Sequence, residues 1–368
     1  MSLATYIKLD AAAALHNFQT VKRFAPNAKI MAVIKADGYG HGALRMANLL
    51  KDADGFAVAR VDEGVRLRKA GIKKRIAVLG GFACVEELAR LLSYQLDAVI
   101  HSHHQLCILA EHDTTKQLSV WLKCDTGMNR LGFKAYELKA VYQQLTQCKQ
   151  IQAPIRFMTH LARADETDND MTSKQIDLFY DVLNTFVERP ECSIANSAGI
   201  LAWRDALADW VRPGIMLYGI SPFADKTGKD LGLKPIMSLH SRLISVKPIY
   251  KGDMVGYGAT WVCEQDTLLG VVAIGYADGY PRHAKTGTPV LVNGQRVSLI
   301  GRVSMDMITV DLSSQPDAKA GDVVTLWGEQ LPVEEIALWS NTIPYTLVCG
   351  ITQRVRQIEA KLSFLPEE

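Results

Sequence analysis

The sequence predicts an α/β protein: an N-terminal (β/α)8 barrel followed by a C-terminal, mainly β domain. Short apolar runs alternate with helix-like segments eight times between residues 30 and about 218. Helical periodicity disappears after Lys234-Pro235, and short β-rich runs then appear between turn signals. A chain of 368 residues is also long for one domain. We therefore predict two domains, spanning residues 1–235 and 236–368.

The barrel strands are predicted from short apolar runs, each of which could be buried on both faces. They are Ile30–Ile34, Phe56–Ala59, Ile76–Leu79, Ala98–Ile100, Val120–Leu122, Ile155–Met158, Ser193–Ala195 and Ile215–Tyr218, the last with Trp210-Val211 before it. Between them, apolar residues recur at helical spacing in segments such as Val61–Ala70, Val85–Leu92, Ala135–Gln147 and Met171–Val187. Eight such repeats fit a closed barrel better than an open doubly wound sheet.

The C-terminal domain is predicted to be a mainly antiparallel sheet. Its expected strands are Leu239–Val246, Leu268–Ala273, Val290–Val292, Val297–Ile300, Ile308–Val310 and Val323–Leu326. Turn pairs such as Asn293-Gly294 and Gly321-Asp322 separate the runs, which is typical of strands joined by tight turns.

The composition excludes several classes of function. The net charge of +2 argues against an electrostatic nucleic-acid binder and against a strongly membrane-attracted surface. No apolar run approaches the roughly 20 residues that a membrane helix needs. The first fifteen residues hold Lys8 and Asp10 among alanines, so we expect no signal peptide there.

The cysteines and histidines point to a cytoplasmic protein that holds no metal. The seven cysteines are scattered and form no C-x-x-C pair, which is typical of reduced thiols in the cytoplasm. His101, His103 and His104 form a cluster that has no acidic or cysteine partner at ligand spacing. We therefore predict no metal site.

The stretch from Ile30 to Gly42 is the candidate centre of the chemistry. The apolar run Ile30–Ile34 ends on Lys35, three glycines follow, and Ala43–Leu50 then has helix-forming composition. The glycine-rich loop fits neither the Walker spacing nor the dinucleotide fingerprint. A surface lysine after a strand is the alternative interpretation. Further polar residues also lie at or near the predicted strand ends, where barrel active sites are built: Arg60, His101, Lys123, Thr159-His160, Asn196-Ser197 and Arg212.

Seven further motifs recur in order along nearly the whole chain. After residues 35–42 (KADGYGHG), they are 123–132 (KCDTGMNRLG) with His160, 196–199 (NSAG), 212–215 (RPGI), 256–259 (GYGA), 275–280 (GYADGY), 301–306 (GRVSMD) and Pro344-Tyr345. This series resembles the alanine racemases, a family of pyridoxal phosphate enzymes built from a barrel and a β domain. The family usually has Asn-Ala where this chain has Asp37-Gly38, a difference that concerns the conformation of the loop rather than the reaction.

The resemblance implies where pyridoxal phosphate binds. Lys35 would form the Schiff base, and it is also the only lysine within a glycine-rich strand–helix loop. The residues implied to hold the phosphate with neutral donors and backbone N–H groups are Tyr39, Ser197, Gly214, Ile215 and Tyr345. A plain helix N-cap is the alternative interpretation of Ser197.

The resemblance also implies a two-base racemisation of alanine. Lys35 and Tyr257 would each act on one face of the cofactor, removing the Cα proton on one side and returning one on the other. Arg212 would face the pyridine nitrogen and, since arginine stays protonated, hold that nitrogen unprotonated. His160 would link Arg212 to Tyr257 through hydrogen bonds. The alternative interpretations are a structural Arg-Pro turn at Arg212 and a turn or strand aromatic at Tyr257.

Substrate binding, modification and assembly follow from the same resemblance. Arg130 and the backbone N–H of Met305 would hold the alanine carboxylate. Lys123 would be carbamylated and orient Arg130, the alternative being an unmodified Lys123 paired with Asp125. A head-to-tail homodimer would bring Tyr257 to the other subunit's cofactor.

Other functions remain as alternatives at this point. A racemase of broader specificity or a barrel-type pyridoxal phosphate decarboxylase would share the cofactor and the architecture. The decarboxylase is expected to lack the Arg-Pro-Gly motif and to place an acid at the pyridine nitrogen. A single-domain pyridoxal phosphate carrier would leave the β domain without a purpose. An alanine racemase could supply D-alanine for peptidoglycan or serve alanine catabolism.

Overall fold

The computed structural model describes residues 5–112 and 114–359, and the chain divides into two compact units. The barrel unit is Phe18–Leu217. The β-rich unit combines Met1–Asn17 with Tyr218–Glu368, as far as these are described. The outer ends of the two predicted domains, 1–4 and 360–368, lie outside the described residues, and the boundary at 235–236 stays a prediction.

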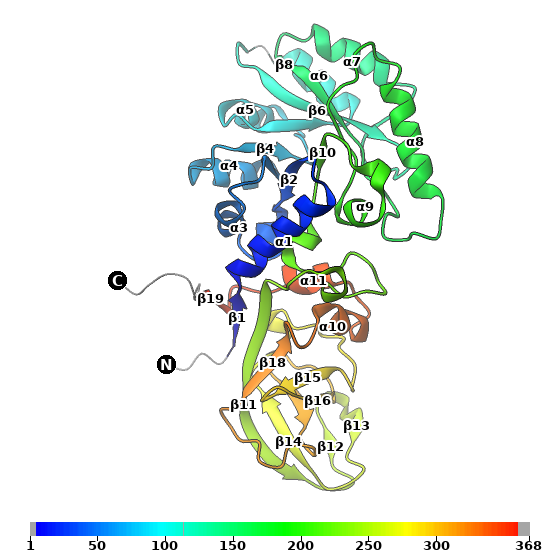
Figure 1. Cartoon of the computed structure of the whole chain (residues 1–368). Helices are drawn as coiled ribbons and strands as arrows, with labels where there is room; N and C mark the ends of the chain where they lie inside the picture. The colour runs from blue at the N-terminus through cyan, green and yellow to red at the C-terminus, as the bar shows by residue number, and fades with distance from the viewer. Residues whose placement is uncertain (1–4, 113, 360–368) are drawn as a thin grey trace. The chain divides into compact units, whose positions relative to one another are not determined.

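The barrel unit contains eight parallel strands that close into a ring (Figure 1). They are β2 (Lys29–Val33), β3 (Gly55–Val58), β4 (Arg75–Val78), β5 (Asp97–Ile100), β6 (Leu118–Asp125), β8 (Ile151–Met158), β9 (Cys192–Ser193) and β10 (Trp210–Val211). Strands that follow one another in this series are paired, and β10 pairs with β2 to close the ring. The short β7 (Phe133–Lys134) adds to β6. The predicted (β/α)8 barrel is confirmed.

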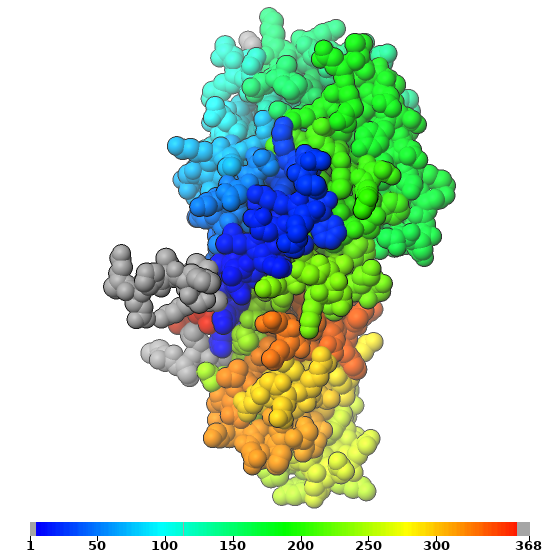
Figure 2. Space-filling model, viewed as in Figure 1, coloured from blue at the N-terminus to red at the C-terminus, as the bar shows by residue number. Residues whose placement is uncertain are grey.

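The helices of the barrel unit lie outside its strands, and side chains fill the spaces between the ribbons (Figures 1 and 2). They are α2 (Lys35–Tyr39), α3 (Ala43–Leu49), α4 (Val61–Lys69), α5 (Val85–Ser93), α6 (His103–Glu111), α7 (Leu138–Gln147), α8 (Met171–Leu183) and α9 (Ser197–Ala202), with the 3₁₀ helix η1 (Arg204–Ala206). Helix α1 (Ala11–Phe24) crosses the division between the units. Their amphipathic pattern explains the packing: α5 buries Leu88, Leu91 and Leu92, which share one helical face.

One predicted strand is wrong. Ile215–Tyr218 forms a 3₁₀ helix, η2, in which Leu217 N donates to Gly214 O at 2.9 Å. The eighth strand is Trp210–Val211 alone. All four residues of η2 are at most 1% exposed. A short apolar run that is buried on every side carries no periodicity that separates a strand from a helix.

The core of the β-rich unit is a ring of six antiparallel strands. In ring order they are β14 (Thr267–Val272), β17 (Ile308–Asp311), β16 (Gln295–Ile300), β15 (Pro289–Val292), β18 (Val323–Trp327) and β11 (Met237–Ile249), and β11 pairs with β14 to close the ring. Side chains alternate between buried and partly buried positions along Met237–Leu243, as expected for a sheet with one face on the core. The predicted mainly β domain is confirmed.

Two strands from opposite ends of the chain extend this sheet, and the sequence analysis anticipated neither. Strand β1 (Tyr6–Leu9) pairs antiparallel with β11 and parallel with β19 (Arg356–Glu359). The unit also contains the hairpin β12 (Met254–Val255) and β13 (Trp261–Val262), helices α10 (Val333–Trp339) and α11 (Pro344–Cys349), and the 3₁₀ helices η3 (Lys229–Leu231), η4 (Tyr257–Ala259) and η5 (Tyr276–Asp278). Among the described residues, no helix combines the length and apolar character that crossing a bilayer requires.

Candidate active site

Lys35 lies just beyond the C-terminal end of β2, as predicted, and a left-handed turn follows it. Ala36 and Asp37 have φ of 51° and Tyr39 of 52°, with Gly38 at 63° between them. Left-handed backbone costs an L-residue about 1–2 kcal/mol, so such a run persists only where its surroundings hold it. Within the turn, Gly38 N donates to Ile34 O at 2.9 Å and Gly40 N to Ala36 O at 3.1 Å.

Tyr39, Ser197 and Gly214 come together into a small polar cradle. Gly214 N donates to Ser197 Oγ at 2.9 Å. A Cβ atom on Gly214 would lie 2.7 Å from the Tyr39 hydroxyl, so only glycine fits at this position without displacing that hydroxyl. Ile215 begins η2 directly after Gly214; the N–H groups of Gly214 and Met216 donate to Ser197 Oγ, and the N–H of Ile215 donates to no acceptor among the described residues. The cradle therefore offers two hydroxyl groups and the backbone N–H of Ile215.

The helix N-cap interpretation of Ser197 is wrong. Asn196 is the N-cap of α9, and its Oδ1 accepts from Gly199 N at 2.9 Å. Ser197 is the first helical residue, and its Oγ accepts instead from Gly214 and Met216 across the chain. The serine hydroxyl thus belongs to the cradle rather than to its own helix end.

Arg212 is a buried cation whose hydrogen-bond acceptors are all neutral. It is 4% exposed, and its guanidinium donates to Ser193 Oγ at 2.5 Å and to the carbonyls of Thr159 and Ile194 at 2.6 and 3.2 Å. Within residues 5–112 and 114–359, no carboxylate forms an ion pair with it. Burial lowers the pKa of Arg212 to about 10, so it stays protonated at neutral pH. A buried cation without an anion is costly unless a bound group supplies an acceptor.

His160 is held as a neutral imidazole beside Arg212. Arg212 Nη2 lies 3.4 Å from His160 Nδ1, and arginine can only donate, so Nδ1 accepts and the proton is on Nε2. Burial, followed by the positive charges of Arg212 and Lys123, holds the pKa of His160 well below its usual value. His160 is therefore neutral across the physiological pH range, with an N–H donor on its far side.

Lys123 lies in a cluster of positive charges. Burial lowers its pKa to about 8, and the charges of Arg212, Arg130 and Lys35 act in the same direction. Three cations thus act on Lys123 at the carboxyl ends of β2, β6 and β10, while the negative charge of Asp125 raises its pKa. Such a cluster favours anionic ligands, since each bound negative charge relieves repulsion.

The alternative pairing of Lys123 with Asp125 is wrong. Asp125 Oδ2 lies 2.7 Å from Lys134 Nζ, and its Oδ1 accepts from the backbone of Gly127 and Asn129 at 3.1 and 2.9 Å. These bonds fold the loop that carries the exposed Arg130. Lys134, rather than Lys123, is the ion-pair partner of this aspartate.

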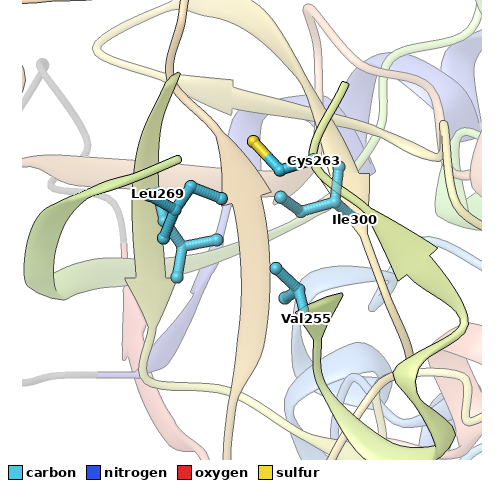
Figure 3. Close-up of a cluster of buried hydrophobic side chains, with 5 residues drawn as sticks. Val255, Cys263, Leu269 and Ile300 are labelled. Carbon is cyan, nitrogen blue, oxygen red and sulfur yellow. The ribbon is translucent and has the colours of Figure 1, made fainter. Parts of the chain in front are cut away.

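In the β-rich unit, Tyr257 stands at the tip of the β12–β13 hairpin. Gly256 and Gly258 flank it at φ of 76° and 74°, which expose the tyrosine on a sharp turn. Its side chain is 68% exposed. The base of the hairpin is anchored in a hydrophobic cluster of Ile249, Val255, Cys263, Leu269 and Ile300, four of which are labelled in Figure 3. The packing of this cluster therefore fixes the hairpin that exposes the tyrosine.

Met305 and Tyr345 also lie in the β-rich unit. Met305 O accepts from Ala277 N at 3.0 Å, which ties the 301–306 motif to the 275–280 motif. In the part of the chain that the structure describes, the Met305 N–H donates to no acceptor. Tyr345 is the second residue of α11 and is half-buried.

The three clustered histidines do not converge. A ring nitrogen of His101 lies 3.0 Å from Gly80 O, one of His103 lies 3.0 Å from Glu137, and one of His104 lies 3.1 Å from Ala83 O. His101 and His104 are therefore engaged with the loop between β4 and α5, and His103 with the residue before α7.

Ser193, whose hydroxyl accepts from Arg212, was not among the predicted site residues. Ser193 is fully buried within β9, and its Oγ also donates to Trp210 O at 2.8 Å. The sequence held a signal for this residue: the serine lies inside a predicted buried strand, and a buried hydroxyl requires a hydrogen-bond partner.

Comparisons with known proteins agree with this architecture. Residues 9–222 match the family model "Alanine racemase, N-terminal domain", and residues 236–359 match "Alanine racemase, C-terminal domain". The chain is 49% identical over 347 residues to an alanine racemase of Nitrosococcus oceani, covering 94% of this chain and 97% of the relative. It is 50% identical over 356 residues to one of Coxiella burnetii, covering 95% and 97%.

A solved structure extends the likeness to three dimensions. The crystal structure of the biosynthetic alanine racemase of Pseudomonas aeruginosa superposes with a TM-score of 0.94 at 42% identity, covering 98% of this chain and 100% of that one. The family models, the relatives and the Pseudomonas aeruginosa structure agree over both units. The chain therefore belongs to the alanine racemase family and is an isomerase that interconverts L-alanine and D-alanine.

Proposed function

We propose that this chain racemises alanine with pyridoxal phosphate, bound covalently by Lys35. The single observation that carries the proposal is that the barrel unit combines a strand-end lysine, a polar cradle and a buried cation with no carboxylate partner among the described residues. The cofactor needs an amine, a phosphate site and a partner for its ring nitrogen, and these three features meet those needs. The match to alanine racemases supports the same cofactor.

The phosphate of the cofactor fits the cradle of Tyr39, Ser197 and Gly214. The hydroxyl groups of Tyr39 and Ser197 can donate to phosphate oxygens, and the start of η2 adds a partial positive charge. Ile215 supplies a further N–H at this end. From the β-rich unit, we assign Tyr345 to the same phosphate on the family resemblance.

Two bases then move the Cα proton. When bound, pyridoxal phosphate withdraws electrons from the Cα of alanine and so makes its proton removable. The Lys35 amine and the Tyr257 hydroxyl act on opposite faces: one takes the Cα proton, and the other returns a proton to Cα. No proton is consumed overall, and the two residues exchange roles in the reverse direction.

Arg212 and His160 support these bases. Arg212 holds the ring nitrogen unprotonated because it can only donate, which keeps the electron withdrawal modest and favours return of a proton to Cα over transamination. His160 accepts from Arg212 through Nδ1, and in the dimer proposed below its Nε2 proton would be donated to the oxygen of the partner's Tyr257. A donor at that oxygen stabilises its deprotonated form, which the basic role of Tyr257 requires.

The substrate carboxylate is held by Arg130 and the Met305 N–H. Arg130 offers a planar pair of donors that matches a carboxylate. Met305 offers an amide that donates to no acceptor among the described residues. Together they fix the orientation of Cα between the two bases.

We further propose a head-to-tail homodimer in which Tyr257 serves the partner's site. Several large apolar side chains of the β-rich unit are more than half exposed: Met254 at 66%, Tyr257 at 68%, Met305 at 53% and Ile343 at 57%. Exposed apolar groups of this size commonly mark an interface. A two-fold dimer would bury them and complete two identical sites.

The proposal is tested by locating the cofactor on the chain. We expect the purified protein to be yellow and to racemise L-alanine, with a decay of optical rotation. Borohydride reduction should fix the cofactor on the peptide that contains Lys35, as peptide mass analysis would show. Recovery of the label on another lysine would reject the assignment.

Replacing Gly214 by alanine is expected to weaken cofactor binding about tenfold or more. The added methyl would lie 2.7 Å from the Tyr39 hydroxyl and force this donor out of the cradle, at a cost comparable to one lost hydrogen bond. Titration of the apoprotein with pyridoxal phosphate measures the change. A Tyr39→Phe background removes the clash, so Gly214→Ala should have a smaller effect there. Equal effects in both backgrounds would contradict the geometry.

Carbamylation of Lys123 is expected to increase with pH. The neutral amine attacks CO₂ to give a carbamate and a proton, and a pKa of about 8 leaves much of Lys123 neutral under mildly alkaline conditions. At constant dissolved ¹³C-labelled CO₂, the carbamate NMR signal should rise between pH 7 and 9 (roughly one unit either side of that pKa) and vanish in Lys123→Met. Lys134 is the matched control, because Asp125 raises its pKa. Clear electron density for an unmodified Lys123 amine at the upper pH would reject the modification.

A further inference from the structure

A single carboxylate, Glu63, joins the ends of two neighbouring barrel strands. Glu63 is the third residue of α4, and its Oε2 accepts from the backbone of Ala59 and Arg60 at 2.8 and 3.0 Å. Its Oε1 reaches the adjacent strand end and accepts from Ala36 N at 2.6 Å. Ala36 directly follows Lys35. The carboxylate therefore holds the amide next to the cofactor lysine.

The third residue of α5 does only the first part of this task, whereas that of α6 also reaches a neighbouring strand end through its amide: Gln105 Nε2 donates to Phe82 O at 3.2 Å. Glu87 in α5 accepts from Ala83 N at 2.7 Å, and Gln105 in α6 accepts from His101 N at 2.7 Å. Both close the junction between their own strand and helix, as a helix-capping acceptor does. The contact of Glu63 with Ala36 differs from both, because here a carboxylate oxygen accepts a backbone N–H of the loop that holds Lys35.

This loop needs support at both ends. Ala36 begins the left-handed run, whose conformation is unfavourable for residues other than glycine. At the far end, Asp37 Oδ1 accepts from Ala43 N at 2.9 Å and fixes the start of α3. Ala36 is the first residue of this left-handed run, and the acceptor of its N–H is thus a side chain from another strand–helix unit.

We propose that Glu63 is a positioning residue for Lys35: its carboxylate holds the left-handed turn and so aims the lysine amine. The proposal rests on the assignment of Lys35 as the cofactor lysine. Both oxygens of Glu63 are acceptors in use, one on each strand end. A glutamine has the same shape but only one acceptor oxygen, and its NH₂ would face a backbone N–H on the other side. Glu63→Gln therefore removes the hydrogen bonding at one of the two strand ends without changing the size of the side chain.

Glu87→Gln is the matched control. Glu87 is half-buried like Glu63 and occupies the same position in the next helix, but only one of its oxygens accepts a backbone N–H. The glutamine oxygen can replace it. Glu63→Asp is the second variant, since the shorter carboxylate stays near its own helix start and loses the reach to Ala36. This variant keeps the capping of α4 and removes only the contact between strand ends.

The experiment measures the opening of the turn and the reactivity of the lysine separately. In the holoenzyme, amide hydrogen exchange over residues 35–42 should accelerate about 10- to 100-fold in Glu63→Gln, as expected for the loss of a charge-assisted hydrogen bond. Borohydride trapping of pyridoxal phosphate at Lys35, started from apoprotein, should slow, and kcat should fall about 10- to 100-fold while KM changes less than about twofold. Glu63→Asp should behave in the same way, and Glu87→Gln should match the wild type in every measurement.

The outcomes separate the two proposals. If wild-type protein carries the label on another lysine, the cofactor assignment fails. If the label is on Lys35 and either Glu63 variant that folds exchanges its turn amides faster but traps and turns over like the wild type, the positioning role of Glu63 is wrong. Equal losses in Glu87→Gln would also overturn it, because they would reveal a general effect of helix capping. If neither Glu63 variant folds, the residue is needed for the fold, and the positioning role is withdrawn.

Discussion

Co-refolding of two inactive variants, Lys35→Ala and Tyr257→Phe, is expected to restore racemisation. Each substitution alone removes one of the two bases and should lower activity at least about 10²- to 10⁴-fold. In a mixed dimer with shared sites, the chain that keeps Lys35 meets the intact Tyr257 of the partner subunit. One of the two sites is then complete, which gives about half the wild-type activity per heterodimer and a quarter for an equal mixture.

The control for this experiment is a partner that cannot complement. Co-refolding Tyr257→Phe with the double variant leaves every site without the tyrosine, so no activity should return. Heterodimers are counted by native mass spectrometry after one chain is tagged. Confirmed heterodimers of the two single variants without activity would mean that both bases come from one chain.

Replacing Arg212 by glutamine should lower kcat about 10²- to 10³-fold, the usual effect of removing a preorganised donor from a reacting centre. Its guanidinium holds Ser193, Thr159 and His160 in one network, and glutamine cannot reach all of these acceptors. Loss of the fixed cation should also let the cofactor nitrogen take up a proton. The ratio of pyruvate released to alanine racemised should therefore rise, which chiral chromatography and a pyruvate assay measure together.

Arg212→Lys separates charge from geometry. Lysine keeps the positive charge but offers a single donor group, so it should preserve the low pyruvate ratio while losing much of kcat. An unchanged pyruvate ratio in Arg212→Gln would show that the cation does not control the fate of the Cα proton.

The fold could be predicted where each element carries its own local signal. The barrel strands up to Met158 are short apolar runs between amphipathic helices, and the sequence located them to within a few residues. Ile215–Tyr218 gave the same apolar signal but forms η2, because burial on all sides removes the periodicity. Strand β1 could not be predicted locally, since its partner β11 lies more than 200 residues away along the chain.

The candidate site was predictable by residue type but not by its internal contacts. Lys35, Arg212 and Ser197 stood out because polar residues at strand ends are informative in a barrel. The left-handed turn was not predictable, since Ala36 and Asp37 rarely adopt positive φ and do so here under the control of a distant carboxylate. For the same reason, Glu63 resembled an ordinary residue in the first turn of a helix. The ion pair of Asp125 with Lys134 was equally hidden, because two lysines lay within its reach in sequence.

The pairing of β1 with β11 and β19 has a consequence for synthesis on the ribosome. The β-rich unit takes its strands from both sides of the continuous segment Phe18–Leu217, with β1 before that segment and β11 and β19 after it. All contacts within the barrel unit are available once that continuous segment has emerged. The sheet of the β-rich unit must wait for its last strand, while β1 remains an unpaired edge for most of translation. We therefore expect the tyrosine-bearing unit to fold after the lysine-bearing unit.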